Sequence, residues 1–248
     1  MPETFSVMTF NLRFGLADDG ENSWDNRKKA YPCLFEQYQP DFIGFQEANN
    51  FQTEYLCRLL EAYGFIGKRK PSPDFWQNNL IFHKKKWVCK NNRHLFLSST
   101  PYVESRLENS RWPRQCTMGL FQHQEKIVIM VNTHFDFSGE VQEQSAELVT
   151  NFLLDFPPGL PTIITGDFNC VPGNTAHKVF MEKGFKDAFK GAHSYTFHGF
   201  TGKEKGGHID WILYRGGLDP VSKKIVKDRF SAFYPSDHFP VLVEFTLL

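Results

Sequence analysis

Short apolar runs rich in β-branched and aromatic residues recur along the chain, and turn-forming residues separate them. Runs of roughly four to eight such residues, bounded by Gly, Pro, Asn, Asp or Ser, are typical of β-strands. The run at 126–132 is the strongest of them, and it leads to His134. Together the runs predict strands at 5–12, 41–46, around 65, 79–83, 87–97, 116–122, 126–132, 161–169, 208–214, around 225 and 239–245.

Four other stretches space their apolar positions as a helix does, namely 22–38, 51–62, 140–156 and 175–182. In the first of these, Asn22 or Ser23 can cap the helix, and Pro32 should kink it or start its second half. Many strands interleaved with few helices predict an α/β fold with layers built on mixed sheets. A chain of 248 residues can bury one large core and is short for two, so we expect a single domain over residues 1–248.

The stretch 161–169 carries the most information about function. It begins as a β-branched run that suits a strand buried on both faces, and it ends in Gly-Asp-Phe-Asn. The two-residue period of a strand points Asp167 and Asn169 to the same side and turns Phe168 into the core. Polar side chains at the carboxyl end of a buried strand often form a site. Asp and Asn also cap backbone groups in ordinary turns, so this stretch alone leaves both interpretations open.

Polar residues end other predicted strands in the same way, and a further strand begins directly after Asp237-His238. Repeated endings of this kind indicate one polar cleft at a rim of the sheets. Carboxylate and amide oxygens are the ligands that Mg²⁺ or Mn²⁺ prefers, and histidines titrate near neutral pH. The strand-end residues are Asn11, Glu47, His134, Asp167 with Asn169, and Asp210.

The composition of the chain limits which kinds of molecule it can bind. Lys plus Arg equals Asp plus Glu at 28 each, so a polyanion would have to be attracted by a local patch. No apolar run approaches the roughly 20 residues that span a bilayer, so we expect no membrane partner. The five cysteines are odd in number and contain no Cys-x-x-Cys pair, which favours a reducing compartment, by default the cytoplasm.

Six motifs in this order resemble the endonuclease/exonuclease/phosphatase superfamily, which has the deoxyribonuclease I-like fold. They run from near the first residue to near the last: Thr9-Phe10-Asn11-Leu12-Arg13, Gln46-Glu47, Asn132-Thr133-His134-Phe135-Asp136, Gly166-Asp167-Phe168-Asn169, His208-Ile209-Asp210-Trp211-Ile212 and Ser236-Asp237-His238-Phe239-Pro240-Val241. The resemblance implies a four-layer αββα sandwich, with two mixed β-sheets face to face and helices outside. It also implies metal-dependent hydrolysis of phosphate esters. The stretch 22–28 is similar to a compact bacterial branch of that superfamily.

The resemblance assigns a metal-binding role to three residues. Glu47 corresponds to the main ligand of Mg²⁺ or Mn²⁺, and Asn11 assists at the metal or at a phosphate oxygen. Asp237 binds a metal directly or through water. Each has an ordinary alternative, since Asn11 can cap a strand end and Glu47 can be the first-turn acid of the next helix.

Catalytic roles follow from the same resemblance. Asp167 orients or deprotonates the attacking water, and Asn169 holds that water or the phosphate. His238 faces the scissile phosphate as a charged donor or general acid, while Asp210 bonds its other ring nitrogen and raises its pKa. His134 contacts the phosphate from the opposite wall. Whether Asp167 or a histidine is the general base stays open.

Outside this set, the candidates for phosphate contacts are Arg27, Arg114 and His208, each of which is otherwise an ordinary surface or loop residue. Asp136 is equally consistent with a role in the site and with capping His134. Trp76 and Trp112 fall in predicted loops where they could stack on a base or a sugar.

Three functions remain open at this point. The first, which the motifs favour, is a phosphodiesterase or nuclease-type hydrolase, and the alternative of the same class is a phosphomonoesterase acting on an inositol-type or nucleotide phosphate. The third is a non-catalytic binding module on the same fold, because a fold alone does not fix a function. The neutral charge favours a small molecule or a nucleic-acid end as the substrate. We expect a monomer.

Overall fold

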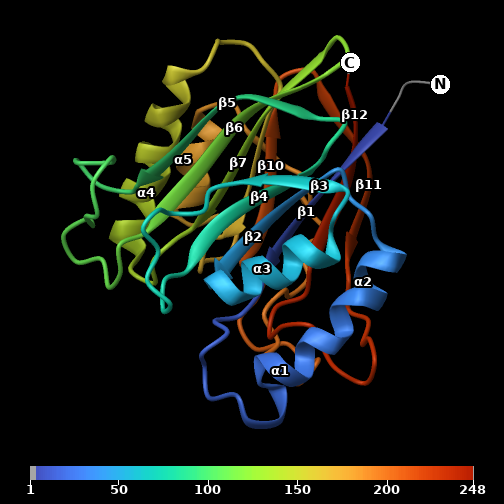
Figure 1. Cartoon of the computed structure of the whole chain (residues 1–248). Helices are drawn as coiled ribbons and strands as arrows, with labels where there is room; N and C mark the ends of the chain where they lie inside the picture. The colour runs from blue at the N-terminus through green and yellow to red at the C-terminus, as the bar shows by residue number, and fades with distance from the viewer. Residues whose placement is uncertain (1–3, 248) are drawn as a thin grey trace.

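The computed structural model describes residues 4–247, so the outermost residues of the predicted domain, 1–3 and 248, lie outside the described part. Two six-stranded mixed β-sheets pack face to face, and helices cover their outer surfaces (Figure 1). The observed architecture is therefore the four-layer αββα sandwich that the motifs implied. No helix between residues 4 and 247 has the length and apolar character needed to cross a bilayer.

Each sheet has one parallel pair of strands near its centre, and its other strand pairs are antiparallel. In spatial order the first sheet contains β11 (Leu218–Ile225), β12 (Val241–Leu247), β1 (Thr4–Asn11), β2 (Phe42–Ala48), β4 (Asn78–Lys84) and β3 (Tyr63–Ile66). The second contains β5 (Val88–Phe96), β6 (Gln115–His123), β7 (Lys126–His134), β8 (Thr162–Asp167), β10 (Asp210–Arg215) and β9 (Lys186–Asp187). The predicted strands agree with these to within a few residues, and only the two-residue β9 was not predicted.

The predicted helix at 22–38 is divided into three pieces. Pro32 lies in the first turn of the last piece, where its missing N–H costs nothing, so it starts the second half as expected. The helices are α1 (Trp24–Arg27), α2 (Tyr31–Gln37), α3 (Asn50–Leu59), α4 (Gly139–Phe152) and α5 (Thr175–Glu182). Single 3₁₀ turns occur at η1 (Gly20–Asn22), η2 (Lys28–Ala30) and η3 (Leu153–Asp155).

Apolar side chains fill three layers. Phe42, Trp87 and Phe121 belong to the layer between the two sheets. A second layer lies between the first sheet and the helices α1 to α3, and a third lies between the second sheet and α4 and α5 (Figure 1). In the third layer Phe168 is fully buried and stacks on Trp211 with 4.2 Å between ring centroids. Phe168 therefore points into the core, as the strand period predicted.

The parallel pairs decide where the polar strand ends meet. β1 runs parallel to β2, and Asn11 pairs with Gln46, the residue before Glu47. β7 runs parallel to β8, and His134 pairs with Asp167. Because the carboxyl ends of parallel strands meet at the same edge of a sheet, each pair delivers its polar residues together.

A buried polar network joins the two sheets directly beneath this edge. The side chain of Gln46 donates to Asn132 Oδ1 at 2.6 Å, and Asn132 donates to the carbonyls of Phe45 and Leu80 at 2.8 Å each. Gly44 makes this approach possible, because a Cβ there would lie 2.3 Å from Thr165 Oγ1 and 2.7 Å from Asn132 Oδ1. The network fixes the spacing of the sheets where the site is built.

Candidate active site

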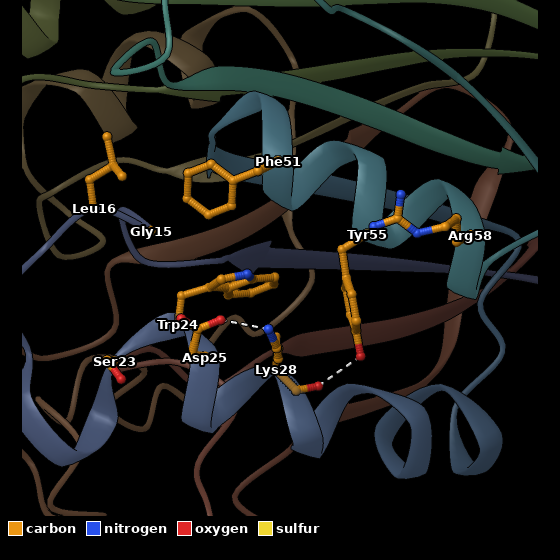
Figure 2. Close-up of a pocket in the computed structure, with 9 residues that line it drawn as sticks. All are labelled: Gly15, Leu16, Ser23, Trp24, Asp25, Lys28, Phe51, Tyr55 and Arg58. Carbon is orange, nitrogen blue, oxygen red and sulfur yellow. Dashed lines mark hydrogen bonds and ion pairs between the residues drawn. The ribbon is translucent and has the colours of Figure 1, made fainter.

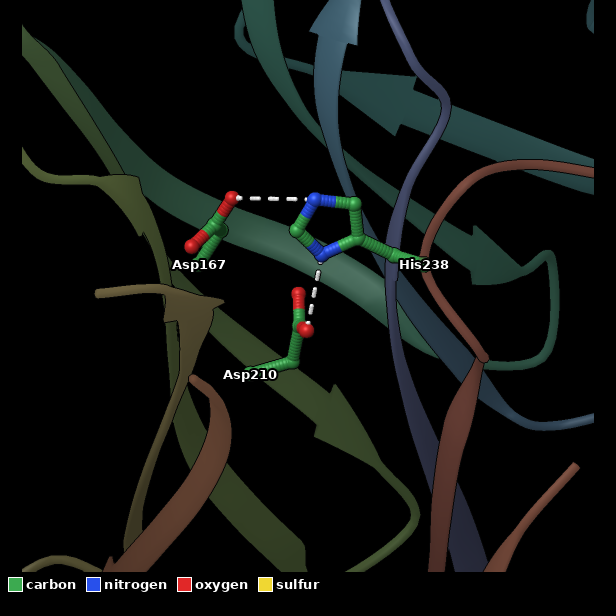
Figure 3. Close-up of side chains that lie close together, drawn as sticks. All are labelled: Asp167, Asp210 and His238. Atoms are coloured by element: carbon green, nitrogen blue, oxygen red, sulfur yellow. Dashed lines mark hydrogen bonds and ion pairs between the residues drawn. The ribbon is translucent and has the colours of Figure 1, made fainter. Parts of the chain in front are cut away.

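Asp167, Asp210 and His238 form the buried centre of the site (Figure 3). Nδ1 of His238 lies 2.9 Å from Asp210 Oδ2, and its Nε2 lies 3.8 Å from Asp167 Oδ2. All three residues are at most 6% exposed. The Asp210 carboxylate therefore holds one nitrogen of the imidazole and turns the other nitrogen towards Asp167.

A loop holds Asp210 and His238 in this arrangement. Thr196 Oγ1 accepts hydrogen bonds from the backbone N–H groups of Ile209 and Asp210 at 3.0 and 3.1 Å. The neighbouring Phe197 forms an isolated β-bridge with His238. Thr196 was not predicted as a site residue, because it follows no strand and belongs to no motif. Its contribution depends on a segment that folds back over the start of β10.

The two carboxylates change the titration of this centre. Burial disfavours a charged imidazole, but Asp210 and Asp167 outweigh that cost and raise the pKa of His238 well above its usual value. Burial, together with repulsion by Asp210, raises the pKa of Asp167 to about 7. His238 is thus a protonated donor at neutral pH, and Asp167 is a carboxyl group that can take up a proton near pH 7.

His134 and Asn169 form a second wall beside Asp167. Asn169 Nδ2 donates to the carbonyl of Phe135 at 2.9 Å and lies 3.1 Å from His134 Nε2, which lies 3.5 Å from Asp167 Oδ2. Because the carbonyl fixes the amide orientation, His134 Nε2 accepts the hydrogen bond and the ring is neutral. Burial, Arg114 and His238 agree with this, since they hold the pKa of His134 well below its usual value.

Asn11 connects the two sheets at the site. Its Nδ2 donates to Glu47 Oε1 at 3.1 Å and to Asp167 Oδ2 at 2.8 Å, while its Oδ1 accepts from the N–H of Arg13 at 2.8 Å. Glu47 has a φ of 61°, at a point where the pairing of β2 with β4 shifts register. A bulge with a left-handed residue re-aims a side chain at the end of a strand, here towards Asn11.

Asp237 lies on the Arg13 side of the site. Its Oδ2 is 3.7 Å from Arg13 Nε, and Arg13 also forms an ion pair with Asp19 at 2.8 Å. The carboxylates of Asp19, Asp237 and Glu47 raise the pKa of the Arg13 guanidinium against the effect of burial. Arg13 was quoted within a motif but assigned no role. Its half-buried guanidinium nevertheless lies beside Asp237. The position of Arg13 in the sequence gave no indication of this contact.

Arg114 and Asp136 border the site on the other side. Arg114 Nε lies 3.5 Å from Asp136 Oδ2, and Arg114 shares a cavity of about 360 Å³ with His134. The same carboxylate oxygen accepts hydrogen bonds from Ser110 Oγ at 3.1 Å and from the N–H of Arg111 at 2.9 Å. Asp136 therefore does not cap His134, and it organises the loop before β6.

Hydrogen bonds and ion pairs thus join seven of the predicted residues in one cluster: Asn11, Glu47, His134, Asp167, Asn169, Asp210 and His238. The profile of the endonuclease/exonuclease/phosphatase family matches residues 8–238, which is most of the chain. The chain belongs to this family.

Individual relatives agree with this assignment. The chain is 25% identical to a solved family member from Bacteroides thetaiotaomicron, with a TM-score of 0.91 over 100% of this chain and 99% of that one. A mannosyl-6-phosphatase from the same organism is 26% identical, with a TM-score of 0.89 over 97% and 99% of the two chains. Nocturnin from Xenopus laevis is 24% identical over 99% of this chain and 73% of its own length.

The family site is suited to a divalent cation. Within residues 4–247, Asp167, Asp210 and His238 are the group of three ligand-type residues whose atoms lie within 4.8 Å of one another. Burial, and then repulsion by Asp210, raise the pKa of Asp167, and a bound cation would relieve both effects. Since His238 Nδ1 is held by Asp210, the oxygens of Glu47 and Asp167 are better placed for a hard ion.

Arg27 and His208, which were predicted to contact phosphate, have other partners in this structure. Arg27 is fully buried, and its guanidinium donates to the carbonyls of Leu12 at 2.5 Å, Arg13 at 2.9 Å and Pro235 at 3.2 Å. It ties two segments of the site together from below and has no surface to offer a substrate.

His208 is 3% exposed, its Nδ1 lies 2.7 Å from the carbonyl of Ser194, and its ring packs against Phe189 and His193. The His208 side chain therefore contacts the segment 189–194, whereas Asp210 contacts His238, although both residues belong to one motif.

A second cavity, of about 400 Å³, lies between α1 and α3, and none of the predicted site residues lines it (Figure 2). Trp24, Phe51 and Tyr55 form part of its walls. Lys28 Nζ is paired with Asp25 at 2.5 Å, so this cation is not free to bind an anion there. The cavity is separate from the acid and histidine cluster.

Proposed function

We propose that this chain is a divalent-metal-dependent phosphoesterase that acts on a small phosphorylated molecule. The observation that carries the proposal is the buried cluster in which His238 is held between Asp210 and Asp167. A protonated donor next to a carboxyl group with a raised pKa is the combination that hydrolysis of a phosphate ester requires.

In this proposal Asp167 accepts a proton from the attacking water, whose oxygen forms the new bond to phosphorus. The bond from phosphorus to the leaving oxygen breaks, and the charge that develops on the phosphoryl oxygens is met by the Nε2–H of His238. Asp210 keeps His238 charged and oriented. Asn11 and Asn169 hold the Asp167 and His134 side chains by the hydrogen bonds described above. Groups of this kind contribute about 10²- to 10⁴-fold each.

Glu47 is the principal residue that would hold Mg²⁺ or Mn²⁺, with Asp167 and Asn11 beside it, since Asn11 Nδ2 bonds both carboxylates. When bound, the ion supplies positive charge for the phosphoryl oxygens. Asp237 is paired with Arg13, which supports a contact through water instead of direct binding by the same ion.

The substrate is more consistent with a phosphomonoester than with the phosphodiester that the motifs alone led us to prefer. The mannosyl-6-phosphatase at 26% identity supports this choice. A formal net charge of zero also speaks against a long nucleic-acid substrate. A terminal phosphate carries up to two negative charges, and the Arg13 and Arg114 guanidinium groups border the site on opposite sides.

The test is hydrolysis of paired substrates, bis(4-nitrophenyl) phosphate and 4-nitrophenyl phosphate, with Mg²⁺, with Mn²⁺ and with EDTA. We expect release from the monoester to exceed release from the diester, and EDTA to abolish it. Asp167→Asn and His238→Gln should each reduce the rate by at least 100-fold, in the range expected for acid–base groups. Arg93→Gln, at an exposed side chain of β5, is the matched control and should keep the wild-type rate.

Hydrolysis that persists in EDTA would refute the metal dependence. Hydrolysis that persists in both site variants would refute the assignment of the site. A faster rate on the diester would restore the phosphodiesterase interpretation without affecting the rest. A monomer and a cytoplasmic location remain predictions.

A further inference from the structure

The cavity lined by His134 and Arg114 has several aromatic walls, which a site for phosphate alone would not need. Its volume is about 360 Å³, within the range of roughly 300 to 1,000 Å³ typical of small-molecule pockets. Four aromatic side chains line it, namely Phe14, Phe75, Trp76 and Trp112. A phosphate group alone would need only donors and cations, so these walls must contact another part of the substrate.

Two of the aromatic side chains that line the cavity leave much of their surface in contact with water. Phe75 is 65% exposed and Trp112 is 49% exposed, although both line the cavity. Leaving large aromatic surface in water costs free energy, about 25 cal/mol for each Å². Exposed apolar residues that converge on one concavity mark a binding surface.

The loop that carries Trp112 is held in place by Asp136. Besides Ser110 and Arg111, the N–H of Trp112 approaches Asp136 Oδ2 at 3.4 Å, and the Arg111 guanidinium lies over the Trp112 ring at 5.0 Å. These contacts pre-organise the ring, so little entropy is lost when a ligand stacks on it.

Trp76 forms a fixed inner wall. It is 7% exposed, and the Arg69 guanidinium covers its ring at a distance of 4.0 Å. Its indole Nε1 is buried without a hydrogen-bond partner among the described residues. A buried N–H without an acceptor is costly, so Trp76 contributes an apolar ring and not a hydrogen bond to the wall.

We propose that this cavity is the subsite for the organic part of the substrate, and that it selects esters whose organic part carries a planar aromatic ring. The inference rests on the proposed function. Trp112 and Phe75 are the specificity-determining residues, because they present flat apolar faces beside His134. A saturated sugar ring with many hydroxyl groups fits less well, since Asn79 Nδ2 already donates to the backbone of Gln115 and four aromatic side chains line the cavity.

The test compares kcat/KM of wild type, Trp112→Ala and Phe75→Ala on four monoesters with Mg²⁺. These are a nucleoside 5′-monophosphate, phenyl phosphate, mannose 6-phosphate and glycerol 3-phosphate. Stacking on an aromatic side chain is worth about 1–3 kcal/mol, so each variant should lose about 5- to 150-fold on the two planar-ring esters. The loss on the other two esters should be at least fivefold smaller. A larger loss on the nucleotide than on phenyl phosphate identifies a nucleobase as the ring.

Two controls separate this inference from a folding defect. Trp112→Phe keeps a flat ring and should retain at least a third of the wild-type kcat/KM on the planar-ring esters. Tyr102→Ala removes a 73% exposed aromatic side chain that does not line the cavity, and it should behave as wild type. Equal losses on all four esters, or the greatest loss on mannose 6-phosphate, would overturn the inference and leave the proposed function intact.

Failure of the proposed function gives a different result, namely no hydrolysis of any ester by the wild type. In that case the subsite is still tested by titrating the nucleotide against wild type and Trp112→Ala by calorimetry. Weaker binding by Trp112→Ala supports the subsite, and equal binding or no binding by the two proteins overturns it.

Discussion

Asp167 and Asp210 occupy directly paired positions on the antiparallel strands β8 and β10. Two carboxyl groups therefore lie side by side in a buried layer, where like charges repel strongly. Burial and this repulsion raise the pKa of Asp167. The imidazole of His238 lies next to both acids and offsets part of the repulsion. The pairing explains why one acid can act as a base near pH 7 while the other keeps a histidine protonated.

The pH profile of kcat/KM should report this pairing. With Mg²⁺ bound, the rate should rise as Asp167 loses its proton, at a pH below the metal-free pKa of about 7 because the cation favours the carboxylate. It should fall again when His238 loses its proton, well above pH 6.5. Asp210→Asn removes the carboxylate that raises both pKa values, so both limbs should move to lower pH. An alkaline limb that stays in place would show that Asp210 does not control His238.

Asp167 should make the metal-free protein less stable at high pH. Its folded-state pKa of about 7 exceeds the unfolded value of about 3.9, so the folded state binds more protons between these values and loses stability as the pH rises through them. Asp167→Asn should therefore raise the free energy of unfolding at pH 8 by about 2 kcal/mol, and by much less at pH 4. Urea unfolding at the two pH values measures this difference. Mg²⁺ should stabilise the wild type at pH 8, and a destabilised variant at pH 8 would contradict the argument.

Arg27 should matter for stability and not for substrate binding. Arg27→Met leaves the buried carbonyl of Leu12 without its side-chain donor, which should cost about 1–3 kcal/mol. The carbonyls of Arg13 and Pro235 each lose one donor but keep Gln52 and Tyr31, respectively. Where the variant is folded, its KM should match the wild type. Arg13→Gln is the comparison, because it removes a half-buried cation beside Asp237 and should raise KM with a smaller loss of stability. Thermal unfolding and steady-state kinetics of both variants decide between the roles.

The network between the sheets should be a further determinant of stability. Asn132→Leu has nearly the same shape but removes the side-chain donor to the carbonyls of Phe45 and Leu80 and one of the three acceptors of Gln46 Nε2, so we expect a loss of about 2–4 kcal/mol. Thr165→Val removes only the hydroxyl that donates to Val131 O and Asn132 Oδ1, and should cost about 1 kcal/mol. Denaturant unfolding of both variants provides the measurement. Equal costs would mean that Asn132 does not hold the sheets together.

The strands could be predicted from the sequence alone, but the contribution of the loop residues to the site could not. Strands β1 and β8 were predictable because a period of two and a β-branched composition are local properties. Trp112 was identified as a loop aromatic residue that could stack on a base or a sugar, but its cavity could not be predicted, because it forms only where Asp136 holds the loop against the site. Thr196 gave no signal, since its hydroxyl becomes important only where it meets the N–H groups of Ile209 and Asp210.

The sequence by itself determined the strands and the polar residues at their ends, because strand period and residue type are local properties. The four-layer sandwich and the chemistry of the site were implied by the resemblance of the six motifs to a known family. The tertiary structure decided which charges are available to a substrate. Arg27 and Arg13 look alike in sequence, but Arg27 is enclosed by carbonyls as distant as Pro235, while Arg13 keeps partial access beside Asp237. Burial and hydrogen bonding depend on segments more than 200 residues apart, and for that reason no local pattern could separate the two.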